Sequence, residues 1–403
     1  MNKNDFLVKI EKLNFKYSKN SINLKIDNLV LPKNKIITLL GPSGSGKTTL
    51  LNLIVGFLKA KKGEIEVSSI PSEIGYIMQQ HSLYEGVSAK ENIYVSAKNS
   101  FSWKYNKKIK FLKTFLEKNF YFQKTITKML VKLTSYTSEK KYKKTYWYEK
   151  LLVFKLFFYL INDLKTLLWF VHNYKLKKMF NNELISIAKQ LEIEKIINKK
   201  PHELSGGEKQ RVAFAKSIIK KNKIIIMDEP FSALDAKIKE QTINWLKKIK
   251  NLYNLSIVIV THDQLDAMKI SDYILILKNG ELQQFDKSEN LYKNPKNLFV
   301  AKFIGFPEIN LMKEDEKFWY YLRSSDFNVV KTTNNKKWQI IDKKSLGDLW
   351  LYDLKIKNED NIIKITSKED YLNIGDFVEL IYDSKKLLIF NKKNEERYYL
   401  NNE

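Results

Sequence analysis

The residues best suited to chemistry form a glycine-rich loop near the N-terminus. The stretch Gly41-Pro-Ser-Gly-Ser-Gly46-Lys47-Thr48 follows an apolar run over 35–40 and precedes a helix-prone segment over 49–57. Glycines let successive backbone N–H groups point inward, where they can cradle phosphate oxygens beside the positive end of the following helix. The loop therefore predicts a phosphate-binding site, in which Lys47 reaches the β- and γ-phosphates and the Thr48 hydroxyl ligates Mg²⁺.

A pair of carboxylates, Asp228 and Glu229, comes directly after the apolar run over 224–227. Such a pair is also common as a helix cap, but its combination with a phosphate-binding loop favours a catalytic role. Asp228 is suited to the Mg²⁺ shell, and Glu229 is suited to polarising an attacking water.

A third pattern, Leu204-Ser-Gly-Gly-Glu208, precedes the carboxylate pair in the chain. Ser205 can cap the helix that follows it, and Gly206 and Gly207 leave room for backbone N–H groups to approach a γ-phosphate. On its own the pattern would be an ordinary helix cap.

With these three motifs in this order, the chain resembles the ATPase subunits of ABC transporters, whose signature LSGGQ appears here as LSGGE. The resemblance covers about residues 6–98 and 183–300. It implies that Tyr17 stacks on adenine, that Gln79 is the Q-loop glutamine and that His262 is the switch histidine. The segment 232–235 matches the D-loop. Glu208 replaces an amide with a carboxylate, and we expect activity to tolerate this change.

The resemblance implies ATP and Mg²⁺ as cofactors and assigns a residue set to each role. The predicted nucleotide-binding residues are Tyr17, Gly41, Pro42, Ser43, Gly44, Ser45, Gly46, Lys47, Thr48, Thr49, Ser205, Gly206, Gly207 and Asp235. The predicted catalytic residues are Glu229, His262, Lys47 and Gln79, and the predicted metal ligands are Thr48, Gln79 and Asp228. Two copies are expected to meet head to tail, with each ATP between Lys47 of one copy and Ser205–Gly207 of the other.

Apolar runs next to these motifs predict the elements that position them. The runs over 7–10, 35–40, 74–78, 224–227 and 257–260 predict strands, and helices are expected over 183–191, after Glu208 and over 237–252. Strands that alternate with helices favour a mainly parallel sheet covered on both faces. We therefore predict an α/β fold, a P-loop NTPase domain of the ABC ATPase type with a helical subdomain, over 1–98 and 183–302.

Residues 99–182 differ from this domain in composition and predict a helical insertion in its helical subdomain. The window 101–180 holds 19 lysines, 4 acidic residues and 21 aromatic residues, with neither glycine nor proline. Ser205 lies 126 positions after Gln79, which is longer than the family pattern requires. The lysine-rich, aromatic composition suits contact with an anionic bilayer surface. A helical hairpin that packs on the protein itself is the alternative, and both interpretations stay open here.

Residues 303–403 predict a small all-β, barrel-like C-terminal domain, because short alternating apolar runs are separated there by Asn, Asp, Gly and Ser. The stretch FVAKFIG before it, and LRSSD within it, resemble the ABC importers for polyamines and for sugars or glycerol phosphate. In that resemblance the domain is regulatory. Exporter ATPases usually lack such a tail, so we expect import.

The amino-acid composition bears on the partners and the location of the protein. The net charge of +26 could indicate a nucleic-acid partner, but only Arg211, Arg323 and Arg397 among 71 basic residues are arginine. Much of the charge is thus expected to be solvated lysine, and no nucleic-acid partner is expected. The chain has no cysteine, which excludes disulfides and thiolate metal sites. The first residues lack the unbroken apolar core of a signal peptide, and the sequence has no apolar run of about 18 residues. We therefore expect a peripheral protein at the cytoplasmic face of the cell membrane.

The resemblance implies two membrane permease subunits as partners and, indirectly, a substrate-binding protein. For the substrate, the lysine- and asparagine-rich composition and the large insertion resemble the polyamine (spermidine/putrescine) importers of wall-less bacteria. The stretch FIGFPEINLM is closer to the sugar and glycerol-phosphate importers. A soluble ABC ATPase that acts on nucleic acid is the alternative from another class.

Overall fold

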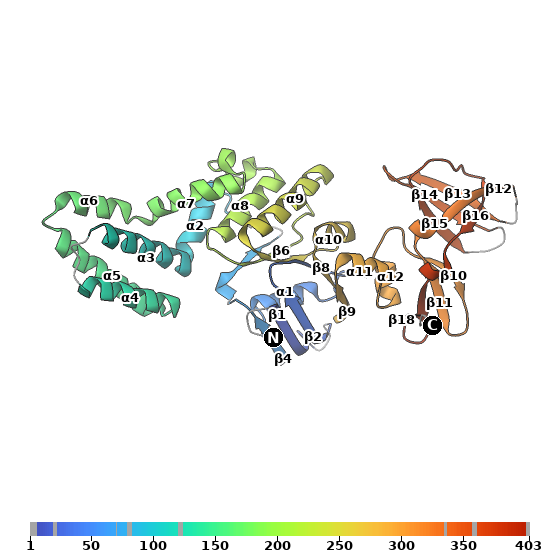
Figure 1. The fold of residues 1–403 in the computed structure, drawn as a ribbon, viewed down its shortest axis with the longest axis horizontal. Coiled ribbons are helices and arrows are strands. Elements are labelled where there is room, and N and C mark those ends of the chain that lie inside the picture. The colour runs from blue at the N-terminus through green and yellow to red at the C-terminus, as the bar shows by residue number, and fades with distance from the viewer. Residues whose placement is uncertain are drawn as a thin grey trace.

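The computed structural model describes residues 6–18, 22–69, 71–78, 83–119, 124–333, 337–356 and 361–399. Figure 1 shows an elongated arrangement in which an α/β core lies between two extensions. A group of helices, α3 to α6, projects from one end, and antiparallel sheets built from the C-terminal residues lie at the other.

The core contains a large mixed sheet with the strand order β4-β1-β2-β9-β8-β3-β7-β6-β5. Its strands are β1 (Phe6–Phe15), β2 (Leu24–Pro32), β3 (Ile36–Leu40), β4 (Lys62–Val67), β5 (Ile74–Ile77), β6 (Ile224–Asp228), β7 (Ser256–Val260), β8 (Tyr273–Lys278) and β9 (Glu281–Asp286). β5, β6, β7, β3 and β8 pair in parallel, whereas β4, β1 and β2 form an antiparallel edge. The predicted α/β fold with a mainly parallel centre is confirmed.

Helices cover both faces of this sheet. Alternate residues of a central strand pack against helices on opposite faces. Ile225 and Met227 of β6 pack in one cluster with the helices that follow the signature, and Ile224 and Ile226 pack in another with α1. Alternate residues of a strand point to opposite faces, so a strand buried on both sides is continuously apolar. The core helices are α1 (Lys47–Val55), α2 (Ala89–Asn99), α7 (Leu176–Gln190), α8 (Gly206–Ile218), α9 (Ala236–Tyr253), α10 (Gln264–Ile270), α11 (Ser288–Lys293) and α12 (Leu298–Phe303).

The predicted insertion is helical and has a hydrophobic core of its own. It comprises α3 (Phe101–Lys118), α4 (Lys124–Ser138), α5 (Tyr142–Leu160) and α6 (Leu164–Asn173). Leu112, Leu133, Leu152 and Phe170 are among the buried residues of this cluster. The helix expected over 183–191 begins earlier, at Leu176, so the proposed boundary at residue 183 falls inside α7.

Within the same core, Glu149 is a buried acid, only 2% exposed. Its Oε1 accepts from Lys108 Nζ at 2.9 Å and from the Tyr174 hydroxyl at 2.6 Å. Burial, first, and the Glu149 charge raise the pKa of Tyr174 far above its ordinary value. The acid thereby joins α3, α5 and the end of α6 across a core that is mostly apolar.

The C-terminal residues form two antiparallel sheets, ordered β10-β11-β17-β18 and β12-β16-β13-β14-β15. The strands are β10 (Asn310–Glu314), β11 (Phe318–Leu322), β12 (Asn328–Thr332), β13 (Trp338–Ser345), β14 (Trp350–Lys355), β15 (Ile362–Ser367), β16 (Phe377–Ile381), β17 (Leu388–Asn391) and β18 (Arg397–Tyr398). The buried Arg323 ties them to the core, because it donates to the carbonyl oxygens of Ala301 and Tyr292 and lies over the Tyr292 ring. Among the described residues, no helix is both long and apolar enough to cross a membrane.

Candidate active site

The glycine-rich loop joins the buried strand β3 to α1, as predicted. Gly44 and Gly46 adopt φ values of 76° and 100°, in the left-handed region that glycine enters without steric cost. A Cβ on Gly41 would lie 2.2 Å from the carbonyl oxygen of Leu277, so the loop could not approach β8 with any other residue. The loop conformation therefore depends on these glycines.

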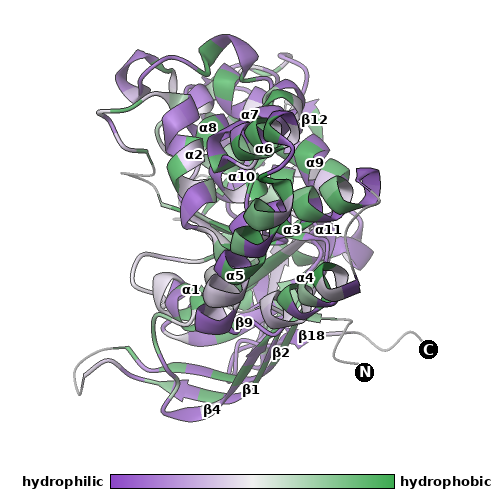
Figure 2. Ribbon diagram, turned by 90° about the vertical axis from the view of Figure 1, so that its left-hand side faces the viewer, coloured by the Kyte–Doolittle hydropathy of each residue, from purple (hydrophilic) through white to green (hydrophobic). Residues whose placement is uncertain are grey.

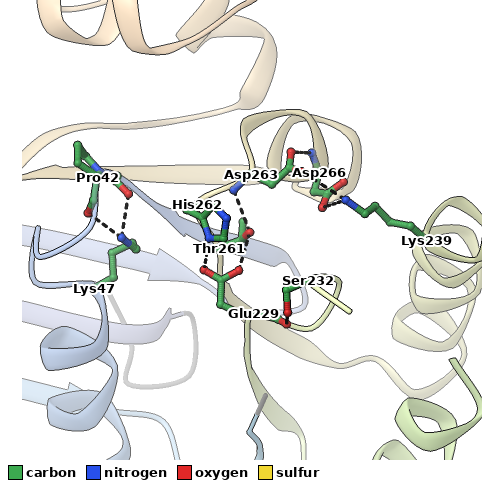
Figure 3. A network of polar contacts seen from close by, with 10 residues as sticks. Pro42, Lys47, Glu229, Ser232, Lys239, Thr261, His262, Asp263 and Asp266 are labelled. Atoms are coloured by element: carbon green, nitrogen blue, oxygen red, sulfur yellow. Dashed lines mark hydrogen bonds and ion pairs between the residues drawn. The ribbon is translucent and has the colours of Figure 1, made fainter. Parts of the chain in front are cut away.

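Lys47 begins α1 and curls back over the loop. Its Nζ donates to the carbonyl oxygens of Gly41 at 2.8 Å and Pro42 at 2.9 Å, as Figure 3 shows. Burial lowers the pKa of Lys47, and the Glu229 and Asp228 carboxylates oppose that shift. An ammonium held only by two carbonyl oxygens can exchange them for an anion, and a polyphosphate would be a stronger partner.

A cavity of about 240 Å³ adjoins the loop and includes an aromatic residue from outside it. It is lined by Tyr17, Ile22, Leu24, Gly44, Ser45, Gly46, Lys47, Thr48 and Thr49. Tyr17 is 54% exposed, so its ring can receive a planar group. The buried Ser45 Oγ has no hydrogen-bond partner in the described residues, which leaves a polar atom available to a ligand beside the loop. These features fit a nucleotide with its phosphates on the loop.

The carboxylate pair lies at the carboxyl end of β6, next to the end of β7. Because β6 and β7 are parallel neighbours, Asp228 pairs with Val260 and brings Glu229 beside Thr261 and His262. Glu229 Oε1 lies 2.8 Å from His262 Nδ1, and the Thr261 hydroxyl donates to Glu229 Oε2 at 3.3 Å. Both contacts are drawn in Figure 3. The imidazole is 69% exposed, which leaves its outer edge accessible to a ligand.

Glu229 also has an unusual backbone. Its φ is 46°, a left-handed conformation that costs a non-glycine residue roughly 1–2 kcal/mol. Its N–H donates to the Val260 carbonyl at 2.9 Å, and its own carbonyl accepts from the Ser232 hydroxyl at 3.0 Å. These bonds hold the strained turn, and such strain is concentrated at functional sites.

The residues present fit a Mg²⁺ ion that is held largely by a nucleotide. Among the described residues there is no group of three or more His, Cys, Asp or Glu side chains that could hold a metal by itself. Mg²⁺ commonly takes one or two protein ligands together with substrate phosphates and water. Burial, and then the Glu229 charge, raise the pKa of Asp228. A cation beside Asp228 would stabilise its charged form.

The signature residues are built as a helix cap. The Ser205 hydroxyl accepts from the Glu208 N–H, and the Glu208 carboxylate accepts from the Ser205 N–H at 2.8 Å. This capping box turns the Glu208 side chain toward the start of α8, which gives the unexpected carboxylate a structural role. A Cβ on Gly206 would lie 2.7 Å from Leu234, so α8 and the D-loop segment pack closely. Ser205, Gly206 and Gly207 do not line the cavity beside Lys47.

The D-loop residue Asp235 caps α9, and it accepts from the Ile238 N–H at 3.0 Å. One turn further on, Lys239 Nζ lies 3.3 Å from Asp263 and 2.9 Å from Asp266. Lys239 therefore ties the helix after the D-loop to α10, which follows His262, as Figure 3 shows. Lys239 and Thr261 were not predicted as site residues. Thr261 directly precedes the predicted His262, whereas no local pattern marks Lys239.

The structure thus brings the predicted residues into three groups and leaves one undescribed. Tyr17 and the loop share a cavity, Glu229 and His262 share a hydrogen bond, and Ser205–Gly207 stand apart at α8. The prediction for Gln79 lies outside the described residues.

Comparisons with known proteins show many relatives of this chain. Residues 24–232 match the family described as ABC transporter. The chain is 31% identical to the spermidine/putrescine import ATP-binding protein PotA of Mycoplasmopsis synoviae, over 90% of each chain. It is 28% identical to PotA of Mesomycoplasma hyopneumoniae strain J, over 92% of this chain and 93% of that one. CbiO1 of Clostridium perfringens, described as part of the ABC transporter complex CbiONQ, shares the fold with a TM-score of 0.50 at 20% identity, covering 71% of this chain and 90% of CbiO1.

Proposed function

Because this chain belongs to the ABC transporter family, as an ATP-binding subunit, we propose that it hydrolyses ATP to drive the import of polyamines such as spermidine and putrescine. The observation that supports polyamines as the substrate is the match to PotA of Mycoplasmopsis synoviae. This match extends over 90% of each chain and so includes residues of the C-terminal sheets. A match restricted to the ATPase core would support the family alone.

The nucleotide is proposed to bind with its base on Tyr17 and its phosphates on residues 41–49. Backbone N–H groups of the loop and the start of α1 would hold the phosphates, and Lys47 would leave the carbonyl oxygens of Gly41 and Pro42 for the β- and γ-phosphates. Thr48, Asp228 and Gln79 would hold Mg²⁺, which neutralises charge that develops on the phosphates.

The hydrolytic step is proposed to rest on Glu229 and His262. Glu229 accepts hydrogen bonds from Thr261 and His262, and this fixes its carboxylate where it can polarise an attacking water. His262 would meet the γ-phosphate with the exposed edge of its ring. Catalysis of this kind works mainly by positioning and by neutralising charge.

A second copy is proposed to complete the site. Ser205, Gly206 and Gly207 do not line the cavity beside Lys47, which supports the proposal that they act on the nucleotide of another copy. In a head-to-tail pair, the start of α8 from one copy would close on the nucleotide of the other. Asp235 would lie at the same junction, at the start of α9.

The working assembly is proposed to include two membrane permease subunits and, through them, a substrate-binding protein, with this chain at the cytoplasmic face of the cell membrane. The Gln79 loop would report the state of the γ-phosphate to the helical subdomain that contacts the permeases. The 303–403 region is proposed as a regulatory domain, and residues 99–182 as an insertion in the helical subdomain of the ATPase domain.

The test is ATP hydrolysis by the chain reconstituted in vesicles with the membrane subunits that its genome encodes beside it. Spermidine, supplied with the binding protein, should stimulate hydrolysis, and Glu229→Gln should abolish that stimulation. Stimulation by a sugar or glycerol phosphate instead would move the chain to that importer branch, which the FIGFPEINLM stretch resembles. Failure to bind any membrane subunit, together with salt-sensitive binding to nucleic acid, would refute the transport function.

A further inference from the structure

The helix α5 carries two apolar faces, and only one of them is used by the fold. Thr145, Glu149, Leu152, Leu156 and Leu160 are buried against the rest of the insertion. They recur every three or four residues and so form one face of the helix. A helix at the surface of a soluble protein would normally present polar residues on the other side.

The opposite face of α5 is instead a stripe of large exposed apolar residues. Trp147, Leu151, Phe154 and Phe158 recur at i, i+4, i+7 and i+11, which places them in one line along the helix. Their exposed fractions are 71%, 46%, 60% and 57%. The rings of Phe154 and Phe158 lie edge to face, with centroids 4.8 Å apart. We call these four residues the outer stripe of α5.

Lysines border the outer stripe on both sides. At 3.6 residues per turn, Lys143 and Lys150 fall on one flank and Lys144 and Lys155 on the other, and all four are exposed. The helix has a single acidic residue, Glu149, and that residue is buried on the inner face. The outer face therefore combines an aromatic line with positive flanks and carries no negative charge.

The next helix also exposes large apolar residues. After α5 the chain turns into α6, where Leu164 and Leu168 are 66% and 64% exposed. Figure 2 views this end of the molecule, where α4 and α5 lie side by side, and Figure 1 shows it at the tip most distant from the C-terminal sheets. The surface therefore lies where an extended flat partner can reach it.

We infer that the outer stripe of α5 with its flanking lysines is a docking surface for an anionic lipid bilayer. Large apolar side chains enter the boundary between headgroups and acyl chains, while lysine stems follow them and keep their ammonium groups at the phosphates. A protein partner would have to bring acidic groups to both flanks, whereas an anionic membrane supplies them everywhere. The stripe does not span a bilayer, and the inference concerns surface binding.

This inference goes beyond the transport function and can be tested without a transporter. The full chain would be floated with vesicles of phosphatidylcholine alone and of phosphatidylcholine mixed with phosphatidylglycerol. We expect it to float with the mixed vesicles. A stripe variant, with Trp147, Leu151, Phe154 and Phe158 each changed to Ser, should bind roughly tenfold or more weakly. A flank variant, with Lys143, Lys144, Lys150 and Lys155 each changed to Gln, should lose a comparable amount, as should the wild type at high salt.

Matched control variants test whether flotation depends on this particular surface, and not on the overall hydrophobicity and charge of the chain. Val330, Ile362, Ile374 and Ile381 are exposed apolar residues of the C-terminal region, and their joint change to Ser should leave flotation unaltered. Lys59, Lys61, Lys368 and Lys393, also exposed, serve as the control for the flank variant. All variants alter exposed side chains, so basal ATP hydrolysis and thermal unfolding should stay near wild type and confirm that the chain has folded.

A spectroscopic readout locates the contact. Brominated lipids quench tryptophan fluorescence at short range, so mixed vesicles that contain them should quench the wild type more than Trp147→Phe. The inference is overturned if the chain does not float, if the stripe variant floats as well as the wild type, or if flotation requires a permease in the vesicles. It is also overturned if the stripe variant abolishes self-association, which would assign the surface to a second copy. Glu229→Gln should float normally, so failure of the transport proposal would leave this test intact.

Discussion

The Glu229 carboxylate lies 2.8 Å from Nδ1 of His262, although 33 positions separate the two residues in the chain. The contact exists because β6 and β7 are parallel neighbours that end at the same edge of the sheet, one residue before Glu229 and two residues before His262. Thr261 completes the arrangement by donating to the second carboxylate oxygen. The backbone of Glu229 is left-handed at this point, with a φ of 46°.

Glu229→Gln should reduce ATP hydrolysis by roughly 10²–10⁴-fold, the range expected for loss of a general base, while nucleotide binding persists. The amide is of the same size and can still pair with His262, so the fold should not change. Steady-state hydrolysis and binding of a fluorescent ATP analogue would measure the two effects separately. Glu281→Gln, at the exposed first residue of β9, is the control and should retain both. Loss of binding together with hydrolysis would contradict the assignment.

Glu208→Gln should leave hydrolysis within about twofold of wild type, because the Gln side-chain oxygen can still accept from the Ser205 N–H and keep the capping box. Glu208→Ala removes that acceptor and should cost the start of α8 about 1 kcal/mol. Its hydrolysis should fall at the same time, since the signature N–H groups lose their fixed direction. Urea unfolding and ATP hydrolysis would be measured for both variants. Equal hydrolysis by Glu208→Gln and Glu208→Ala would argue against a role for the capping box in activity.

Lys239→Met should loosen α10 from α9 by removing the partner of the buried Asp266. We expect a loss of about 1–3 kcal/mol in unfolding free energy at neutral pH. Burial already raises the pKa of Asp266, and without Lys239 it should rise further. The folded state then binds more protons than the unfolded state at acidic pH, so the loss should shrink as pH falls. Urea unfolding at pH 7 and pH 5 measures this, and Lys237→Met on the exposed side of α9 is the control.

Glu149→Ala should destabilise the insertion and spare the nucleotide site. It leaves the Lys108 ammonium and the Tyr174 hydroxyl without their shared acceptor, which costs about 2–4 kcal/mol. Hydrogen exchange should rise in α3, α5 and α6 but not in β3, β6 or β7, and nucleotide affinity should be unchanged. Glu117→Ala, which is exposed on α3, should have no such effect.

Lys216→Met should be most stable relative to the wild type at pH 7, because burial lowers the pKa of Lys216 from 10.5 to about 8, with a further contribution from Lys220. The variant also loses the contact of the ammonium with the Tyr84 ring, and that loss offsets part of the gain. Below about pH 8 the folded state carries a charged, partly buried ammonium. As pH rises toward 10.5 the folded lysine loses its proton first, so the destabilisation fades. The gain of the variant, about 1 kcal/mol after allowance for solvent screening, should therefore be largest at pH 7 and small at pH 10. Urea unfolding of the variant and the wild type between pH 7 and pH 10 measures this difference. A gain that grows as pH rises would contradict the prediction.

The sequence alone predicted the centre of the fold and the motifs that the proposed chemistry uses. The glycines of residues 41–48 act through their own backbone, so a strand before them and a helix after them are enough to predict a phosphate-binding loop. The buried runs over 224–227 and 257–260 are strands because a continuously apolar segment of that length needs cover on both faces. The lysine-rich stretch after residue 99 was predicted to be helical from its composition, and α3 to α6 confirm this.

Only the tertiary structure decided features that depend on residues far apart in the chain. The edge strand β4 and the hairpin strand β9 are mostly polar or exposed, so no apolar period marked them, and their partners hold them in place. Tyr17, two residues after β1, and Leu24, the first residue of β2, line one cavity with the loop, and Lys239 reaches Asp266 only because α9 packs on α10. The sequence could show that α5 is rich in aromatic residues. Which of them are buried was decided by packing, since α4 and α6 cover one side of α5 and leave the line from Trp147 to Phe158 exposed.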